Sequence, residues 1–440
     1  MATPVPPAPT AGARAPAYIT LVALGALIGV PAALVAVLFL AAVHWSEHLL
    51  WTELPTLLGR SEPPWYLIIG LPVAGALIVA TSRRLLPGGG GHSPLEGIST
   101  DPTPLRYAPG VALAAFGSLA FGAVVGPEAP LIALGSAVGM VVVAVAKVPT
   151  PASATLANAG SFSAISALFG GPLVAGMLLL EAGLAAGAAL LPALLPGLVA
   201  AAVGYVLFVG FGDFAGLPTA GLAVPDLPAY TGLHAGDLAL AIVVGVVVSV
   251  FVRGVLHVGR LIDSQARLRS PFVALLAGGL AIGLLAQAAG WLGADPHEVL
   301  FSGQSAIPSL LAESSAVMVV VILAAKAIAY AVCLGCGFRG GPVFPAIFLG
   351  VGVAAVVCLV TDASITWALA VGAAAGMVSA TGLVFSALIF SALLTGGAGQ
   401  DALPAAVLAV VAAWLTTTWL QRREQAPTAP VDAVSQDRAG

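Results

Sequence analysis

Stretches without charged residues recur along the whole chain and limit what it can fold into. A membrane-spanning helix needs about 20 mostly apolar residues, and runs near that length cover residues 18–43, 66–81, 107–125, 130–146, 172–190, 191–211, 236–252, 271–293, 315–335, 342–361, 364–380 and 402–419. Charged residues make up only 8% of the chain, whereas soluble domains carry about 25%. Because so few charges cannot cover a water-facing surface, the sequence predicts an all-α polytopic membrane protein.

The two ends of the chain differ from this apolar part. Residues 1–17 are rich in Pro and Ala, and residues 421–440 are polar, so we expect both segments to be disordered. The transmembrane part is then 18–420, and we expect no regulatory domain after it. Arginines cluster in 82–106, in 253–269 and at the start of the tail. Since basic loops mark the cytoplasmic side, both termini are predicted to be cytoplasmic and the loop 44–65 external.

An internal repeat divides the chain into two halves. GPEAPLIALG (126–135) and GPVFPAIFLG (341–350) share the form G-P-x-x-P, with a closing Gly nine positions after the first. Halves of about 18–211 and 236–419 are the economical interpretation. In many transporters such halves have inverted topology, and their broken helices meet near the bilayer midplane. The many Gly and Pro residues that interrupt the apolar runs favour broken and tilted helices here.

In both copies of the repeat, Gly and Pro precede an apolar run, as expected for a helix that begins inside the bilayer. The first four N–H groups of a helix have no intrahelical partner, and together with the helix dipole they attract anions. Two such termini, one from each half, would form an anion site, and Arg339 just before the second could add a full charge. The predicted anion-binding residues are Gly126, Pro127, Ala129, Gly340, Gly341, Pro342, Val343 and Phe344.

Glu128 is the only formal charge between Tyr107 and Ala146. It stands in the first turn of the first predicted helix, where the dipole favours a carboxylate. Ionisable residues inside the membrane are functional by default, so we interpret Glu128 as a gate that can occupy the anion site or leave it, and as a candidate proton carrier. The alternative is a carboxylate that caps its own helix.

These motifs resemble a known family. GPEAP (126–130) is similar to the G-(R/K)-E-G-P motif of the chloride channel (CLC) family of anion channels and proton/anion exchangers, and GGPVFPAIFLG (340–350) to its G-G-I-F-A-P segment. LFGGPLVAGMLLLE (168–181) resembles the segment between them, and GGGGHSPLEG (88–97) falls where the family has G-S-G-I-P-E. The resemblance spans about 18–420 and looks closest to a divergent bacterial branch. It implies a homodimer with one pore per subunit, in the bacterial plasma (inner) membrane.

The chain departs from the family pattern at several side chains. The family's central serine falls at Gly91 or at His92, and Ser93 is the nearest hydroxyl. No tyrosine stands where the family has its pore tyrosine. The inner glutamate of the exchangers aligns with Ala182, one residue past Glu181. These departures weaken the case for chloride selectivity and for proton coupling, and they favour passive or weakly coupled movement.

Other charged residues in the apolar part have two interpretations each. Lys326 is either an electrostatic element of the pore or half of a structural ion pair. Glu181 either lines an inner proton path or has a structural role. The six histidines show no metal-ligand spacing, so no metal or cofactor is expected. Nucleic acid is excluded as a partner because the fifteen Lys and Arg residues are thinly scattered.

Several functions therefore stay open at the level of sequence. The first is transport of a small inorganic anion, chloride before others, gated by Glu128. Within this class a passive channel, a proton-coupled exchanger and a fluoride-type transporter are alternatives. A different class is proton-coupled transport of a small organic molecule. An intramembrane enzyme ranks last, because the spans hold no paired carboxylates and no Ser/His or His/Asp cluster.

Overall fold

The computed structural model describes residues 15–148, 150–183, 190–212, 222–232, 234–268, 270–361 and 363–425. The first half contains α1 (Ala15–His48), α2 (Leu54–Leu57), α3 (Trp65–Leu85), α4 (Ala108–Leu119), α5 (Glu128–Val145), α6 (Thr150–Phe169), α7 (Pro172–Ala182) and α8 (Leu190–Gly212). A π-helical turn, Leu49–Glu53, joins α1 to α2, and 3₁₀ turns at Pro94–Glu96 and Leu105–Tyr107 lie between α3 and α4.

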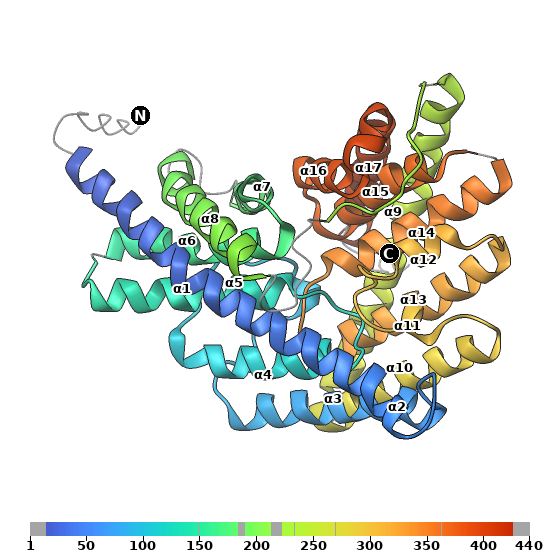
Figure 1. Ribbon diagram of the computed structural model, residues 1–440, viewed down its shortest axis with the longest axis horizontal. Coiled ribbons are helices and arrows are strands. Elements are labelled where there is room, and N and C mark those ends of the chain that lie inside the picture. Colours follow the sequence, from blue (N-terminus) through green and yellow to red (C-terminus); the bar gives the residue numbers. More distant parts are fainter. Residues whose placement is uncertain are drawn as a thin grey trace, which may run out of the picture.

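The second half is helical in the same way. It contains α9 (Ala235–Arg267), α10 (Pro271–Trp291), α11 (Pro296–Val299), α12 (Ile307–Ala312), α13 (Ala316–Cys336), α14 (Val343–Thr361), α15 (Ile365–Thr381), α16 (Val384–Thr395) and α17 (Leu403–Gln425). The 3₁₀ segment Gly396–Ala402 separates α16 from α17. In Figure 1 helices α5, α6 and α8 of the first half lie on the left and helices α13 to α17 of the second half on the right, while α1 runs diagonally to α2 at the lower right.

Eight helical stretches among the described residues are long and apolar enough to cross a membrane. Others are too short: α4, α7 and α16 have 12, 11 and 12 residues, whereas a span needs about 20 at a rise of 1.5 Å per residue. The prediction of an all-α polytopic membrane protein with broken helices is confirmed.

The helices of the second half pack as their counterparts in the first half do. Helix α5 packs on α6, α6 on α8, α8 on α1 and α1 on α5; likewise α14 packs on α15, α15 on α17, α17 on α9 and α9 on α14. The two halves join where α3 packs on α10 and α7 on α16. The internal repeat seen in the sequence is therefore a repeat of helix packing.

The closing glycine of each repeat lies where two helices cross. Gly135 of α5 lies against the backbone of Gly160 in α6, and Gly350 of α14 lies against that of Gly372 in α15. A Cβ at any of these four positions would overlap a carbonyl oxygen. Small residues let membrane helices approach this closely, since packing rather than hydrophobic burial holds them together.

Two helices of more than ten residues fall outside the predicted apolar runs, α6 and α16. Helix α6 was not predicted as an apolar run because its Ser, Thr and Asn residues lower its hydropathy. It is nevertheless buried between α5, α8 and α1. Its hydroxyls bond to neighbouring backbones, Ser161 Oγ to Ile132 O at 2.9 Å and Ser163 Oγ to Gly29 O at 2.7 Å.

The predicted segment boundaries shift slightly. Most of the loop predicted at 44–65 is helical, and ordered helix extends beyond both predicted limits of the transmembrane part, from Ala15 to Gln425. Residues 1–14 and 426–440, predicted to be disordered, lie outside the described residues.

Candidate functional site

Helices α5 and α14 begin side by side, at the two copies of the repeat. Gly126 and Gly341 form an antiparallel bridge, in which Gly126 N donates to Gly341 O at 2.8 Å and Gly341 N donates to Gly126 O at 2.6 Å. These glycines occupy the same position in the two repeats. Reciprocal antiparallel pairing of equivalent residues is what a local two-fold axis produces, so the halves are related by such an axis here.

The Glu128 side chain reaches across from α5 to the N-terminus of α14. Its Oε1 accepts a hydrogen bond from the main-chain N–H of Val343, the first residue of α14, at 2.6 Å. The residue is fully buried, and its Oε2 has no hydrogen-bond partner among the described residues. The carboxylate therefore lies where the free N–H groups and the dipole of α14 would attract an anion. A cap confined to its own helix does not describe this arrangement.

Two glycines leave the room that this carboxyl group occupies. A Cβ built on Gly126 would overlap Oε2 of Glu128, and one built on Gly341 would overlap Cδ and Oε1. Neither glycine has a positive φ, so glycine is required here for space rather than for backbone freedom. A Cβ on Gly340, in contrast, would meet the side chain of Val125.

Tyr330 of α13 supports the same N-terminus, and sequence reasoning missed it. Its buried hydroxyl donates to Pro342 O at 3.1 Å. Next to it the rings of Phe344, Phe169 and Phe390 form a cluster, with centroids 4.4 to 6.4 Å apart. A single tyrosine in an apolar run gives no pattern, so only the fold could reveal its position.

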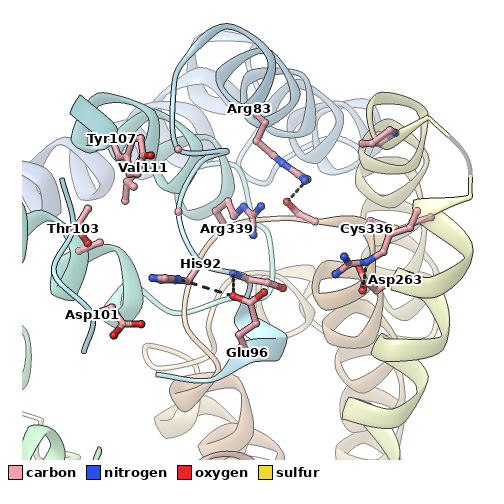
Figure 2. Close-up of a pocket in the computed structure, with 18 of the residues that line it drawn as sticks. Arg83, His92, Glu96, Asp101, Thr103, Tyr107, Val111, Asp263, Cys336 and Arg339 are labelled. Atoms are coloured by element: carbon pink, nitrogen blue, oxygen red, sulfur yellow. Dashed lines mark hydrogen bonds and ion pairs between the residues drawn. The ribbon is translucent and has the colours of Figure 1, made fainter. Parts of the chain in front are cut away.

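A cavity of about 470 Å³ lies on one side of the crossing, and we call it the arginine cavity (Figure 2). Its charged and histidine lining residues are Arg83, His92, Glu96, Asp101, Asp263, Arg267 and Arg339. Asp263 and Arg267 form an ion pair at 2.8 Å. Arg83 and Arg339 donate to main-chain carbonyl groups at 3.1 and 3.0 Å, and neither has a carboxylate partner within the described residues. Outside the Asp263–Arg267 pair, the wall carries two guanidinium groups, Arg83 and Arg339, and two carboxylates, Glu96 and Asp101.

A smaller cavity of about 20 Å³ continues from the arginine cavity toward α5 and α14. Ala129, Gly340, Arg339 and His92 line it. Its volume suits about one water-sized particle. Nε of Arg339 is buried without a hydrogen-bond partner in the described part of the chain, so this guanidinium keeps a donor available.

A second cavity of about 470 Å³ lies on the other side, and we call it the Glu47 cavity. Glu47, His44 and Gln304 line it, together with Pro127. It shares no lining residue with the arginine cavity. Glu128 follows Pro127, which faces the Glu47 cavity, and precedes Ala129, which faces the small cavity. It is buried between them in the chain and lines neither cavity itself.

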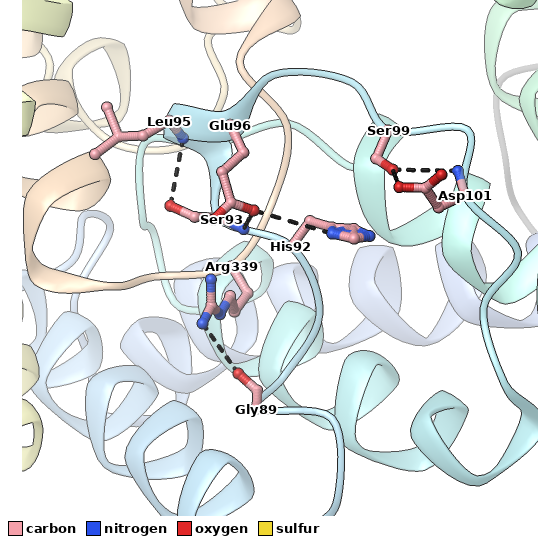
Figure 3. Close-up of polar contacts among 8 residues, drawn as sticks. All are labelled: Gly89, His92, Ser93, Leu95, Glu96, Ser99, Asp101 and Arg339. Carbon is pink, nitrogen blue, oxygen red and sulfur yellow. Dashed lines mark hydrogen bonds and ion pairs between the residues drawn. The ribbon is translucent and has the colours of Figure 1, made fainter.

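The loop before α4 brings three predicted vestibule residues to the arginine cavity. Gly91, His92 and Ser93 all line it, and each glycine of the run Gly88–Gly91 has a positive φ. The Ser93 hydroxyl accepts from Leu95 N at 3.4 Å, and Glu96 Oε2 accepts from Ser93 N at 3.3 Å (Figure 3). Ser93 therefore caps its own turn.

Lys326 lies away from these cavities. Its buried Nζ donates to four main-chain carbonyl groups, those of Glu298, Val299, Leu300 and Phe301, at 2.9, 3.4, 2.9 and 3.3 Å. The Nζ atom also lies 4.4 Å from the centre of the Phe348 ring. The expected carboxylate partner is replaced by carbonyl oxygens, and this lysine holds the 298–301 turn in place.

Glu181 also lines none of the three cavities. Its carboxylate accepts from Phe385 N at 2.8 Å, from Ser386 N at 2.7 Å and from Ser386 Oγ at 2.5 Å. These groups form the start of α16, which has no side-chain cap of its own. Glu181 thus ties α7 to α16 across the two halves. Among the described residues no group of His, Cys, Asp and Glu could hold a metal ion.

Comparison with known proteins identifies the family of this chain. The model of the voltage gated chloride channel family matches residues 92–417. The chain belongs to this family. Curated relatives include "Putative ion-transport protein YfeO" of Salmonella newport, 31% identical over 340 residues, which span 74% of this chain and 77% of the relative. The protein of the same name from Salmonella schwarzengrund is 29% identical over 338 residues, with the same coverage.

Solved structures of the family share the fold. A slow cyanobacterial Cl⁻/H⁺ antiporter superposes with a TM-score of 0.71 at 18% identity, covering 92% of this chain and 97% of that one. A CLC-type fluoride/proton antiporter superposes with a TM-score of 0.66 at 20% identity, covering 90% and 95%. At these identities the likeness concerns the fold, which agrees with the predicted CLC-like architecture of two inverted halves.

Proposed function

We propose that this protein carries small inorganic anions, chloride before others, across the membrane along a path through the arginine cavity, the small cavity and the Glu47 cavity. Membership of the family supports anion transport as the general activity. The observation that carries the proposal is the Glu128 carboxylate, which binds the N-terminus of α14 between two cavities that share no wall. A negative side chain at an anion site acts as a gate, because a mobile anion can bind only when the side chain leaves.

The path would bind anions mainly through backbone groups and arginines. The first turns of α5 and α14 supply free N–H groups and dipole ends, and Gly340, Gly341, Pro342 and Val343 shape the second of them. Arg339 and Arg83, which have no carboxylate partner within the described residues, would supply positive charges for a passing anion in the arginine cavity. Because the side-chain hydroxyls of the family are absent, selectivity would depend on the volume of the small cavity and on the charge of Arg339.

Two features support inorganic anions over organic substrates and leave fluoride as the second candidate ion. The space beside Ala129 and Gly340 is about 20 Å³, which admits one particle of about the size of water. An organic molecule would have to widen this passage. A compact anion such as fluoride fits it, and a structural neighbour is a fluoride/proton antiporter.

The membrane and assembly follow from the same proposal. We expect the bacterial plasma membrane, with both termini and the arginine cavity on the cytoplasmic side, because basic loops stay inside. The loop 82–106 carries Arg83, Arg84 and Arg106, and it forms part of the arginine cavity. By resemblance to the family we expect a homodimer with a separate path in each subunit.

The test is flux from liposomes that hold purified protein, with anion efflux and internal pH recorded together. Wild type is compared with Glu128→Gln, which keeps the size of the side chain and removes its charge, and with Glu181→Gln as a matched control outside the path. We expect wild type and Glu181→Gln to release chloride, and Glu128→Gln to release it faster and without protons. Absence of chloride, fluoride and nitrate efflux from wild type would refute anion transport.

A further inference from the structure

The exchangers of the family take protons from the cytoplasmic side through an inner glutamate, and this chain has no free equivalent. Ala182 stands at the aligned position, and the adjacent Glu181 accepts three hydrogen bonds from the start of α16. Glu181 lines none of the three cavities. If Glu128 exchanges protons with the cytoplasm, another group must carry them.

His92 is the titratable residue whose position fits that task. It lines both the arginine cavity and the small cavity, and its side chain is 44% exposed. Its Nδ1 lies 4.0 Å from Oε2 of Glu96, which is itself 62% exposed (Figure 3). The small cavity leads on to Ala129, the neighbour of Glu128. His92 therefore connects open solvent to the last space before Glu128.

We propose that His92, supported by Glu96, transfers protons between the arginine cavity and Glu128. The proposal rests on the proposed anion transport and adds a proton route to it. In the step that begins at the arginine cavity, the imidazolium gives one proton, through a water molecule in the small cavity, to the Glu128 carboxylate. The products are a neutral imidazole and a neutral carboxylic acid, and a hydronium ion in the arginine cavity then reprotonates the imidazole and becomes water.

The chemistry of the surroundings suits such a relay. Histidine is the side chain that ordinarily changes charge between pH 5 and 8. A space of about 20 Å³ holds about one water molecule, which can bridge two groups that do not touch. The charged and titratable groups facing His92 from the packed elements are Glu96, Asp101, Arg83, Arg339, Tyr107, Asp263 and Arg267. Three of these groups are carboxylates and three are guanidinium groups.

A neutral carboxylic acid would also loosen the gate. The bond from Val343 N to Oε1 is charge-assisted only while Glu128 is ionised, and such bonds are about twice as strong as neutral ones. A proton delivered by His92 therefore weakens the hold of α14 on the side chain and admits the anion. Proton delivery and anion entry are coupled in this way at a single side chain.

The experiment measures the ratio of protons to anions in the liposome assay for wild type, His92→Ala, Glu181→Gln and a matched control, His234→Asn. His234 is exposed and lies outside all three cavities. Because His92 also lines the anion path, the readout is the ratio of proton flux to anion flux, whatever the anion flux of the variant. We expect this ratio to fall at least about a hundredfold in His92→Ala, the low end for a positioned proton-transfer group. Imidazole added on the side of the arginine cavity should restore the proton flux, because that cavity can admit the free ring. Neither control should change the ratio.

Several results would overturn the proposal, and they are separate from failure of anion transport itself. A wild-type ratio in His92→Ala removes His92 from the proton path. Loss of both fluxes without rescue by imidazole makes the residue structural. Anion flux without protons in wild type also refutes the relay while anion transport stands, whereas no anion flux in wild type refutes both.

Discussion

Replacing Gly341 by Ala should open the anion path without touching Glu128. The new Cβ would overlap Cδ and Oε1 of the Glu128 side chain, so the buried carboxyl group cannot stay in its present position. The carboxyl group must then leave the N-terminus of α14. Backbone strain plays no part, since φ of Gly341 is not positive.

The size of the effect follows from the contact that is lost. The bond from Val343 N to Glu128 Oε1 is 2.6 Å long, and a hydrogen bond to a charged group contributes about 1.5–3 kcal/mol. Each 1.4 kcal/mol changes an equilibrium constant about tenfold. The closed arrangement should therefore lose roughly 10- to 150-fold in population relative to the open one. Where the closed state limits transport, chloride flux should rise by at least about tenfold.

The assay is chloride efflux from liposomes, with Gly340→Ala as the matched control. The Cβ of that variant would meet the Val125 side chain and the main-chain oxygen of Gly126, but not Glu128. It therefore disturbs the same loop without direct overlap with the carboxyl group. Gly126→Ala should act like Gly341→Ala, because its Cβ would overlap Oε2. In a Glu128→Ala background neither substitution should add to the flux, since contacts that share one partner are not additive. Two results would refute the overlap between the new Cβ and the Glu128 carboxyl group as the cause. One is a flux in Gly341→Ala equal to that of wild type, and the other is an equal rise in Gly340→Ala.

Three further results are expected. Lys326→Met should lower the free energy of unfolding by at least about 3 kcal/mol, measured by denaturation in detergent, because it leaves buried carbonyl groups without a donor. Glu181→Gln should cost about 1–2 kcal/mol by the same measurement, as loss of a helix cap does, with the proton-to-anion ratio unchanged; a changed ratio would return Glu181 to the proton path. The pKa of Glu298 is raised, mainly by burial and also by the nearby Asp295. The stabilising contribution of Glu298 is therefore present at low pH and is lost as the pH rises through the raised pKa. Glu298→Gln should remove this loss in melting curves recorded between pH 4 and 8.

The fold was largely predictable because the membrane dictates it. Every spanning segment must satisfy its own backbone, so long apolar runs had to be helices, and G-P-x-x-P marked where two of them begin. The apolar runs did not include α6, because neighbouring helices surround it and buried serines such as Ser161 form hydrogen bonds to those neighbours. High hydropathy predicts a helix that faces lipid, so it does not detect a helix that is enclosed by other helices.

The site was predictable only where a motif carried it. The G-P-E motif indicated a carboxylate at a helix N-terminus, but not that Glu128 would bind α14 rather than its own helix. Tyr330 and the four carbonyl groups around Lys326 depend on contacts between segments distant in sequence. No spacing rule could anticipate them, because the chain order of these segments says nothing about which turn faces which helix.

The arrangement also explains why the chain breaks its own symmetry at one position. Gly126 and Gly341 are equivalent and bond to each other across the two-fold axis, and two residues further on Glu128 corresponds to Val343. The carboxylate of Glu128 binds the N–H of this counterpart. A second carboxylate at position 343 would lie close to that of Glu128, between the starts of α5 and α14. Two carboxylates at close range cannot both ionise readily. One of them would stay neutral or leave, and the pair would no longer close the path reliably. A single carboxylate at one of two equivalent helix ends is therefore sufficient for a gate, and a symmetric pair would work less well.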